Sequence, residues 1–355
     1  MTKSFFKTFI ADLGDVDTTV ASEGTSSAEF TGYIDTGSYT MNAALSGSIF
    51  GGMPNNKALI LAGESTTGKT FYALALVKNY QRQYPEGQVI YFDTESAVTN
   101  EMLTERGIDL NRIAKSEPDS IEKFRSMATK MLDKYLELSV EKRFPMLMVL
   151  DSLSALPSKK ETEDIANEKD VRDMTKAQLI KGAFRVLRLK MAKAKVPLII
   201  TNHLYAVIGA YVPTKEMAGG SGAKYAADTI AFLSKKKERD SDKDVIGNIV
   251  TATMVKSRLT KENAKVETRI LYDGGLDRYY GLLDYAQEAG IVKRVGNKYE
   301  FPNGEKGFEK AVLTRPEKYF TEDVLNALDE YIGSTFKYSN GTVDVSDAEI
   351  LDDEA

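Results

Sequence analysis

The segment from residue 63 to residue 70, GESTTGKT, carries the clearest chemistry in the chain. It fits the pattern G-x-x-x-x-G-K-[ST], in which backbone N–H groups of a loop converge on phosphates. The apolar run KALILA precedes it and a helical pattern follows, so the loop opens at a helix N-terminus, which favours anions. The lysine would reach the outer phosphates, and the threonine hydroxyl after it would ligate Mg²⁺. The predicted nucleotide-binding residues are Gly63, Glu64, Ser65, Thr66, Thr67, Gly68, Lys69 and Thr70.

Two carboxylates follow other apolar runs and complete a site for ATP hydrolysis. Asp151 ends MLMVLD, and Glu95 comes shortly after QVIYFD. If both runs are parallel strands, their carboxyl ends share the sheet edge at which ligands bind. Asp151 would then be a metal ligand beside Thr70, and Glu95 would polarise the attacking water. The alternatives are an Asp that begins a turn and an exposed loop acid, but the neighbouring phosphate loop favours the catalytic interpretation.

Alternating strand and helix patterns must position these residues. Apolar runs predict strands at 57–62, 88–93, 146–151 and 196–202, and helical periodicity predicts helices at 70–84, 121–135 and 171–195. This order predicts an α/β fold with a mainly parallel central sheet. Later strands at 229–233, 249–256 and 266–272 read as antiparallel additions. The predicted divisions are an N-terminal arm (1–36), a core (37–280), a small C-terminal module (281–340) and an acidic, disordered tail (341–355).

Composition removes several classes of protein. The 355 residues include no Cys and one His, which excludes disulfide scaffolds, thiolate metal sites and sites built from several histidines. The N-terminus does not resemble a signal peptide, and no apolar run approaches the ~18 residues of a membrane span. We therefore expect a soluble cytoplasmic protein without a membrane partner. The net charge is -5, but residues 343–355 carry six acids and no base, so the remainder is close to neutral.

The motifs GESTTGKT, YFDTES, LMVLDSLSAL, IITNH and MVKSR follow one another in an order and spacing that resembles the RecA family. The resemblance is closest to the UvsX recombinases of tailed phages and covers roughly residues 36 to 300. It implies a RecA-type P-loop ATPase core in which Asp151 is the Walker B acid and Glu95 activates water. It also implies that His203, where bacterial RecA has Gln, senses the γ-phosphate of ATP and signals to a DNA-binding loop.

The resemblance further implies that Lys256 and Arg258, in MVKSR, reach across a subunit boundary to the ATP of a neighbour. Cations near the γ-phosphate stabilise charge that develops in phosphoryl transfer, so this arrangement would couple hydrolysis to assembly. On a strand, the i, i+2 spacing places both side chains on one face. The alternative is two solvated cations at a strand edge.

Two further segments match the DNA loops of the family. Residues 158–175 are dense in charge and by composition form a solvated loop, whereas residues 204–223 are apolar and aromatic yet broken by Gly and Pro. The expected contacts are sequence-tolerant, with cations on phosphates and apolar side chains between bases. The candidate DNA-binding residues are Lys159, Lys160, Arg172, Lys176, Tyr205, Tyr211, Gly219, Gly220 and Ser221. Ordinary packing is the alternative for both tyrosines.

One further basic group has no assigned role at this point. Lys181, Arg185 and Arg188 recur at i, i+4 and i+7, which gives a predicted helix a positive face. This face suits DNA, a subunit contact or simple exposure to solvent.

The function expected from the resemblance is a Mg²⁺- and DNA-dependent ATPase that forms helical filaments on single-stranded DNA. It would catalyse pairing and strand exchange with homologous double-stranded DNA in phage recombination, repair and replication, in the cytoplasm of the host bacterium. A single-stranded-DNA-binding protein and a recombination mediator are expected partners. The alternatives are a hexameric helicase motor on the same core and an ATP-switched single-stranded-DNA-binding assembly without strand exchange. Closed rings would indicate the first alternative, and function that is unchanged after Glu95→Gln would indicate the second.

Overall fold

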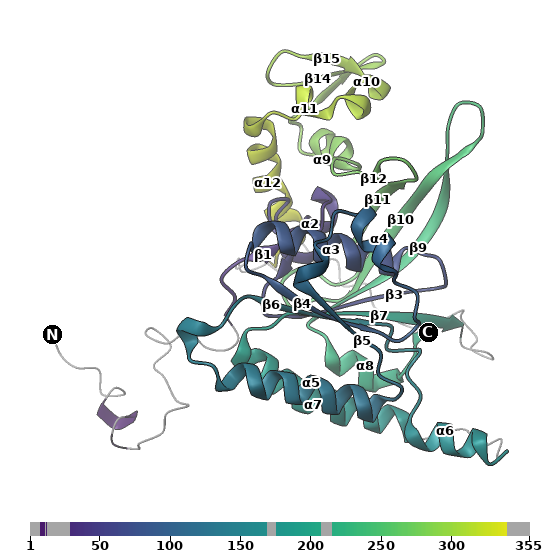
Figure 1. The fold of residues 1–355 in the computed structure, drawn as a ribbon. Coiled ribbons are helices and arrows are strands. Elements are labelled where there is room, and N and C mark those ends of the chain that lie inside the picture. The colour runs from purple at the N-terminus through teal and green to yellow at the C-terminus, as the bar shows by residue number, and fades with distance from the viewer. Residues whose placement is uncertain (1–7, 11, 13–28, 169–174, 207–214, 339–355) are drawn as a thin grey trace, which may run out of the picture.

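A computed structural model describes residues 8–10, 12, 29–168, 175–206 and 215–338. Within these ranges a ten-stranded sheet forms the centre of the fold (Figure 1). Its order is β12-β11-β10-β9-β3-β7-β6-β4-β5, and β8 pairs with β7. The mutually parallel strands are β3 (Ala58–Gly63), β4 (Gln88–Asp93), β5 (Ile113–Ser116), β6 (Met146–Asp151), β7 (Leu198–Ala206) and β9 (Thr229–Arg239). The antiparallel strands are β8 (Lys215–Met217), β10 (Val245–Lys256), β11 (Lys265–Leu271) and β12 (Gly275–Leu276). The prediction of an antiparallel strand at 229–233 was wrong, because β9 pairs parallel to β3; the antiparallel orientation predicted for 249–256 and 266–272 is confirmed.

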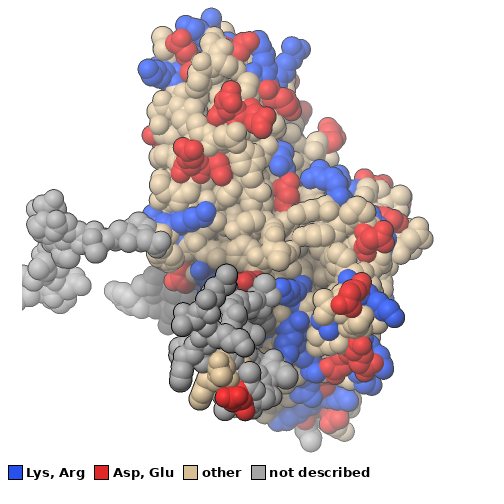
Figure 2. Space-filling model, turned by 90° about the vertical axis from the view of Figure 1, so that its left-hand side faces the viewer, with Lys and Arg blue, Asp and Glu red and all other residues tan. Residues whose placement is uncertain are grey.

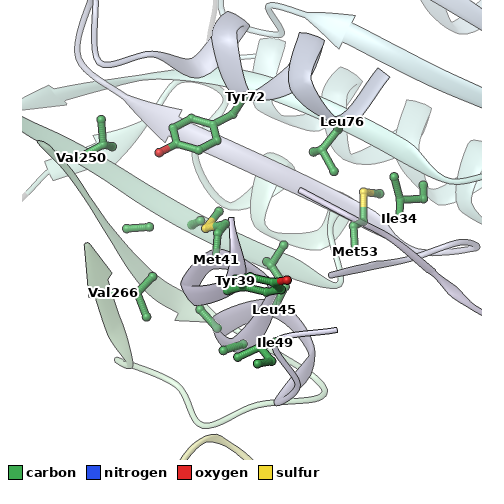
Figure 3. Packing of buried hydrophobic residues seen from close by; sticks show 14 of the residues in the cluster. Ile34, Tyr39, Met41, Leu45, Ile49, Met53, Tyr72, Leu76, Val250 and Val266 are labelled. Carbon is green, nitrogen blue, oxygen red and sulfur yellow. The ribbon is translucent and has the colours of Figure 1, made fainter. Parts of the chain in front are cut away.

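Helices cover both faces of this sheet, so the predicted α/β class is confirmed. One face carries α2 (Tyr39–Ser46), α3 (Lys69–Gln83) and α4 (Asn100–Glu105). The other carries α5 (Ile121–Glu137), α7 (Lys176–Ala194) and α8 (Gly220–Ala226) (Figure 1). Each face has its own apolar cluster, and Figure 3 shows side chains of α2, α3, β10 and β11 meeting in the first of them.

Local sequence explains why these elements form. Strand β3 is buried along its whole length, as expected of an apolar central strand in a parallel sheet. Helix α5 begins at Ser120, whose side chain accepts a hydrogen bond from the N–H of Lys123. Its apolar residues at helical spacing are buried, and the ring of Phe124 meets that of Phe92 edge-on with centroids 5.0 Å apart. The helical period predicted for this segment is therefore confirmed.

Two segments are more regular than the sequence predicts. Part of the expected charged loop is the helix α6 (Lys159–Ala166), which projects from the body (Figure 1). A capping box stabilises its start, because Ser158 accepts from the N–H of Glu161 while Glu161 accepts from the N–H of Ser158. In the 204–223 segment, β7 continues to Ala206 and pairs with β8, and α8 then follows. Both loop predictions were therefore wrong for these described parts.

The C-terminal segment folds as a small sheet with helices above the main body (Figure 1). Asp329 ties it to the core, because its Oδ1 accepts from the Ile49 N–H at 2.7 Å and from the Ser48 hydroxyl at 2.8 Å. The Phe336 carbonyl also accepts from the Lys261 N–H at 2.8 Å. Its elements are α9 (Leu282–Glu288), β13 (Lys293–Val295), β14 (Lys298–Glu300), β15 (Lys306–Phe308), α10 (Glu309–Thr314), α11 (Pro316–Tyr319) and α12 (Glu322–Phe336).

The end of the predicted arm also packs on the core. Strand β1 (Tyr33–Ile34) pairs with β2 (Met53–Pro54), and Asp35 forms a 2.8 Å ion pair with Arg278. The boundaries at 36, 280 and 340 stay predictions. Across the described ranges, no helix combines the length and apolarity that crossing a bilayer requires.

Candidate nucleotide and subunit-contact site

The sheet order brings the predicted catalytic residues to one edge. Strands β3, β7, β6 and β4 are neighbours, and they run parallel with their carboxyl ends together. Gly63 pairs in register with His203, and Asp93 with Asp151. Glu95 follows β4 at the same edge. The phosphate loop, both carboxylates and His203 therefore share the edge at which α/β folds bind ligands.

Tight geometry shapes the phosphate loop. A Cβ atom on Gly63 would lie 2.4 Å from the Thr67 hydroxyl oxygen and 2.9 Å from the Leu233 carbonyl oxygen, so only glycine fits. Gly68 precedes α3 with a left-handed φ of 95°, which glycine adopts without strain. The chain thereby turns directly from strand into helix, and the N-terminus of α3 points into the loop.

Lys69 lies over this loop and is only 7% exposed. Its Nζ donates to the Gly63 carbonyl at 3.1 Å and to the Glu64 carbonyl at 2.9 Å. Burial lowers the pKa of Lys69, while the charges of Glu95 and Asp151 act in the opposite direction. Thr70 is the second residue of α3. A buried ammonium, a hydroxyl and free helix N–H groups form a donor set that fits a triphosphate with Mg²⁺.

Asp151 is buried at the end of β6 and is oriented by two hydroxyl groups. The Tyr91 hydroxyl donates to its Oδ2 at 2.7 Å, and the Thr201 hydroxyl donates to its Oδ1. Burial, and then the negative charge of Asp151, raise the pKa of Tyr91 well above its usual value. Among the described residues, no group of three or more acidic or histidine side chains could hold a metal by itself. A single oriented carboxylate fits Mg²⁺ that also takes phosphate oxygens.

Glu95 and His203 are in contact. The Glu95 Oε1 accepts from the Ser152 hydroxyl at 2.5 Å and lies 3.2 Å from the His203 Nε2. The same Ser152 hydroxyl lies 2.8 Å from the Ser154 hydroxyl. Ser152 could not be singled out from sequence, because the contact joins residues that follow two different strands. The arrangement leaves the second Glu95 oxygen free of protein hydrogen bonds among the described residues.

Lys256 and Arg258 lie at the opposite end of the strands, where the parallel strands begin. Strand β10 runs antiparallel to β9, so Lys256 pairs with Ile230 near the start of β9, whereas Gly63 pairs with Leu233. The Lys256 Nζ donates to the Lys224 carbonyl at 2.8 Å and to the Ala227 carbonyl at 2.7 Å. Each strand residue adds ~3.3 Å, so the length of the strands separates these cations from the phosphate loop of the same copy.

The candidate DNA-binding residues fall into three groups. Lys159 and Lys160 are exposed on α6, and Lys176 is paired with Glu161 at 3.0 Å. Tyr205 is 58% exposed, so it is not packed in the core. Gly219 and Gly220 lead into α8, which also contains Ser221. Arg172 and Tyr211 lie outside the described residues, as does the side chain of Ser221.

Two lysines near the phosphate loop were not predicted. The Lys215 Nζ lies 2.7 Å from Glu64 Oε1, and this pairing lowers the pKa of Glu64. The Lys235 Nζ donates to the Thr66 hydroxyl at 3.0 Å. Charges of both signs intermingle over the face drawn in Figure 2, so no single sign dominates that face of the molecule.

The fold and the phosphate loop together define a P-loop ATPase core. The family model of the RecA N-terminal domain matches residues 4–277. The "Recombination and repair protein" of Enterobacteria phage T4 is 37% identical over 270 residues, which cover 75% of this chain and 67% of the phage protein. "Protein RecA" of Thermotoga maritima is 29% identical over 269 residues, covering 76% and 71%. "Protein RecA" of Streptomyces ambofaciens is 28% identical over 275 residues, covering 77% and 70%. The chain therefore belongs to the RecA family.

Proposed function

We propose that the chain is a recombinase that hydrolyses ATP, forms helical filaments on single-stranded DNA and catalyses homologous pairing and strand exchange. Family membership and the similarity to a phage recombination and repair protein support this function. One geometric observation carries the assembly part: the phosphate loop and the pair Lys256 and Arg258 occupy opposite edges of one sheet. These cations can serve a triphosphate only if it is bound to another copy.

The residues at the carboxyl edge divide the chemistry among them. The α3 N–H groups and Lys69 would hold the phosphates, while Thr70 and Asp151 would hold Mg²⁺. Bound ATP with Mg²⁺ supplies the phosphoanhydride bond that is cleaved and the cation that offsets its negative charge. Glu95 would orient the attacking water and accept its proton on the carboxylate oxygen that has no hydrogen-bond partner within the part of the chain that the structure describes. His203, in contact with the other oxygen, would sense whether the γ-phosphate is present and transmit this through β7 to the DNA-binding segment.

The subunit contact would complete the site. Lys256 and Arg258 would stabilise the negative charge that develops on the γ-phosphate of a neighbour. A surface that binds a different surface on the next copy makes a head-to-tail contact, which produces either a helix or a ring. DNA would bind through Lys159, Lys160, Tyr205 and the segment before α8, and this assignment is a prediction. A single-stranded-DNA-binding protein and a mediator are also predicted partners.

The test combines ATPase and pairing assays at low salt. We expect hydrolysis to rise sharply with single-stranded DNA and joint molecules to form with homologous duplex. Electron microscopy with an ATP analogue that resists hydrolysis should show open helical filaments. Absence of both DNA stimulation and joint molecules would reject the proposal, and closed rings that unwind duplex DNA would identify a helicase motor instead.

A further inference from the structure

Three cations converge on the short corner between α8 and β9, which comprises residues 224–228. Lys256 donates to the Lys224 and Ala227 carbonyls, as described above. Arg188, from α7, donates to the Tyr225 carbonyl at 2.9 Å and to Asp228 Oδ1 at 2.8 Å. Arg258 approaches the same carboxylate oxygen with its Nε at 3.4 Å. Cations from α7 and from the end of β10 thus meet at the end of the sheet opposite the phosphate loop.

Hydrogen bonds to both carboxylate oxygens hold the Asp228 side chain in place in this corner. Its Oδ2 accepts from the Ala58 N–H at 3.0 Å, and Arg188 holds its Oδ1. The Asp228 side chain is 9% exposed, whereas that of Arg258 is 59% exposed. The contact with Asp228 runs through the Nε of Arg258, and no described residue hydrogen-bonds its two terminal guanidinium nitrogens, so these can bind an incoming anion. A partly desolvated carboxylate held by several donors can set the direction of an exposed arginine.

A cavity of about 160 Å³ opens beside these groups. Lys57, Arg188 and Arg258 line it, with Asp228 as its one carboxylate. Burial lowers the pKa of Lys57, and the nearby charges of Arg258 and Arg188 lower it further while Asp228 acts in the opposite direction. Lys256 shows the same pattern, with burial first and then the two arginines lowering its pKa. Positive charge therefore exceeds negative charge here, so the cavity suits a polyanion.

We propose that Asp228 and Arg188 are positioning residues for Arg258, and that the cavity beside them receives the phosphate tail of a nucleotide bound to an adjacent copy. This rests on the proposed function, because it presumes that Arg258 acts on the nucleotide of a neighbour. Asp228 sets the direction of the guanidinium, and Arg188 holds Asp228 in place. The excess positive charge of the corner is then offset by the phosphates when copies assemble.

Asp228→Asn and Arg188→Gln test the proposal, measured by turnover of the ATPase stimulated by single-stranded DNA. The asparagine can keep an acceptor for the Ala58 N–H through its Oδ1, but it loses the negative charge and turns an NH2 group, which cannot accept, toward Arg188 and Arg258. Arg258→Ala should lower kcat by at least about tenfold. Asp228→Asn and Arg188→Gln should each lower kcat by roughly three- to tenfold, because the arginine loses its orientation. The KM for ATP should change less than kcat, because Arg258 acts on charge that develops in the transition state, whereas the phosphate loop of the neighbouring copy provides most of the ATP-binding groups.

A double variant separates positioning from a structural role. If Asp228 acts through Arg258, Asp228→Asn should have no further effect on kcat in an Arg258→Ala background. Arg188→Lys should restore part of the activity lost in Arg188→Gln. Arg185→Gln, on the exposed side of the same helix, is the matched control for fold and charge. Arg188→Gln should unfold at a lower temperature than Arg185→Gln because it loses the hydrogen bonds to Tyr225 and Asp228, so turnover is compared at a temperature at which both variants are folded. This comparison keeps the test valid if Asp228→Asn is unstable.

Two results distinguish the possible failures. The inference is overturned, and the proposed function stands, if Arg258→Ala lowers turnover while Arg188→Gln turns over like the unmodified protein. The same holds if the losses in kcat from Asp228→Asn and Arg258→Ala add up in the double variant. If Arg258→Ala turns over like the unmodified protein, the role of Arg258 in the proposed function fails, and the positioning proposal fails with it.

Discussion

Replacing Ser152 with alanine should slow ATP hydrolysis without weakening ATP binding. The Ser152 hydroxyl donates to Glu95 Oε1 at 2.5 Å and holds the carboxylate that we assign to water activation. A hydrogen bond to a charged group contributes about 1.5–3 kcal/mol, and the partial exposure of Glu95 places this one at the lower end. A loss of about 1.5 kcal/mol from transition-state stabilisation corresponds to roughly a tenfold lower rate. The Ser152 N–H donates to the Thr94 hydroxyl, which donates to the Ser152 carbonyl; neither bond involves the Ser152 hydroxyl, so both should persist.

Single-turnover hydrolysis on saturating single-stranded DNA measures this effect, and nucleotide affinity is measured separately. Ser154→Ala is the matched control, because the Ser154 hydroxyl meets that of Ser152 at 2.8 Å and makes no hydrogen bond to Glu95. We expect the control to lose less than about threefold in rate. Equal rates for Ser152→Ala and the unmodified protein would refute the reasoning, as would equal losses in the two variants.

Three further predictions concern the loop, the core and the sensor. Gly63→Ala should weaken ATP binding and destabilise the fold by about 1–3 kcal/mol, because its Cβ would collide with Thr67. Gly182→Ala is the control: its Cβ would meet open space in α7, so it should stabilise the fold by up to about 1 kcal/mol. Denaturant titrations measure both free energies of unfolding. Phe124→Ala should cost about 3–5 kcal/mol of unfolding free energy in the same assay; a loss below about 1 kcal/mol would contradict its core position. His203→Gln should retain DNA-stimulated hydrolysis because an amide N–H can also donate to a carboxylate, while His203→Ala should lose it; equal stimulation in both variants would exclude the sensor role.

Much of the catalytic edge could be predicted from sequence because each of its parts is local. A buried strand, a glycine-containing turn and a helix start are contiguous in residues 58–70, so the phosphate loop can be recognised without tertiary information. Asp151 is likewise marked by the apolar strand that it ends. Strand β5 was missed because its four residues, IAKS, are short and partly polar, and only pairing with β4 stabilises them in the strand.

The contacts that orient catalytic groups could not be predicted from sequence. Ser152 meets Glu95 across 57 residues, and Arg188 meets Asp228 across 40. Each partner alone resembles many other serines, acids or exposed arginines. In the segment after β7, glycine signalled irregular structure, but Gly222 instead permits close packing: its Cβ would lie 2.5 Å from the Ala177 carbonyl in α7. The sequence does not show which helix will pack against a given glycine, so this contact between α7 and α8 could not be predicted.

Mixing two inactive variants tests most directly whether the site is shared between copies. Glu95→Gln protomers keep Lys256 and Arg258 but cannot activate water, and Arg258→Ala protomers keep Glu95 but lack the cation for a neighbour. In an equimolar mixed filament on single-stranded DNA, roughly one site in four pairs an intact Glu95 with an intact Arg258, so turnover should recover to about a quarter of that of the unmodified protein. A mixture no more active than its separate components would contradict a shared site, as would full turnover by Arg258→Ala alone.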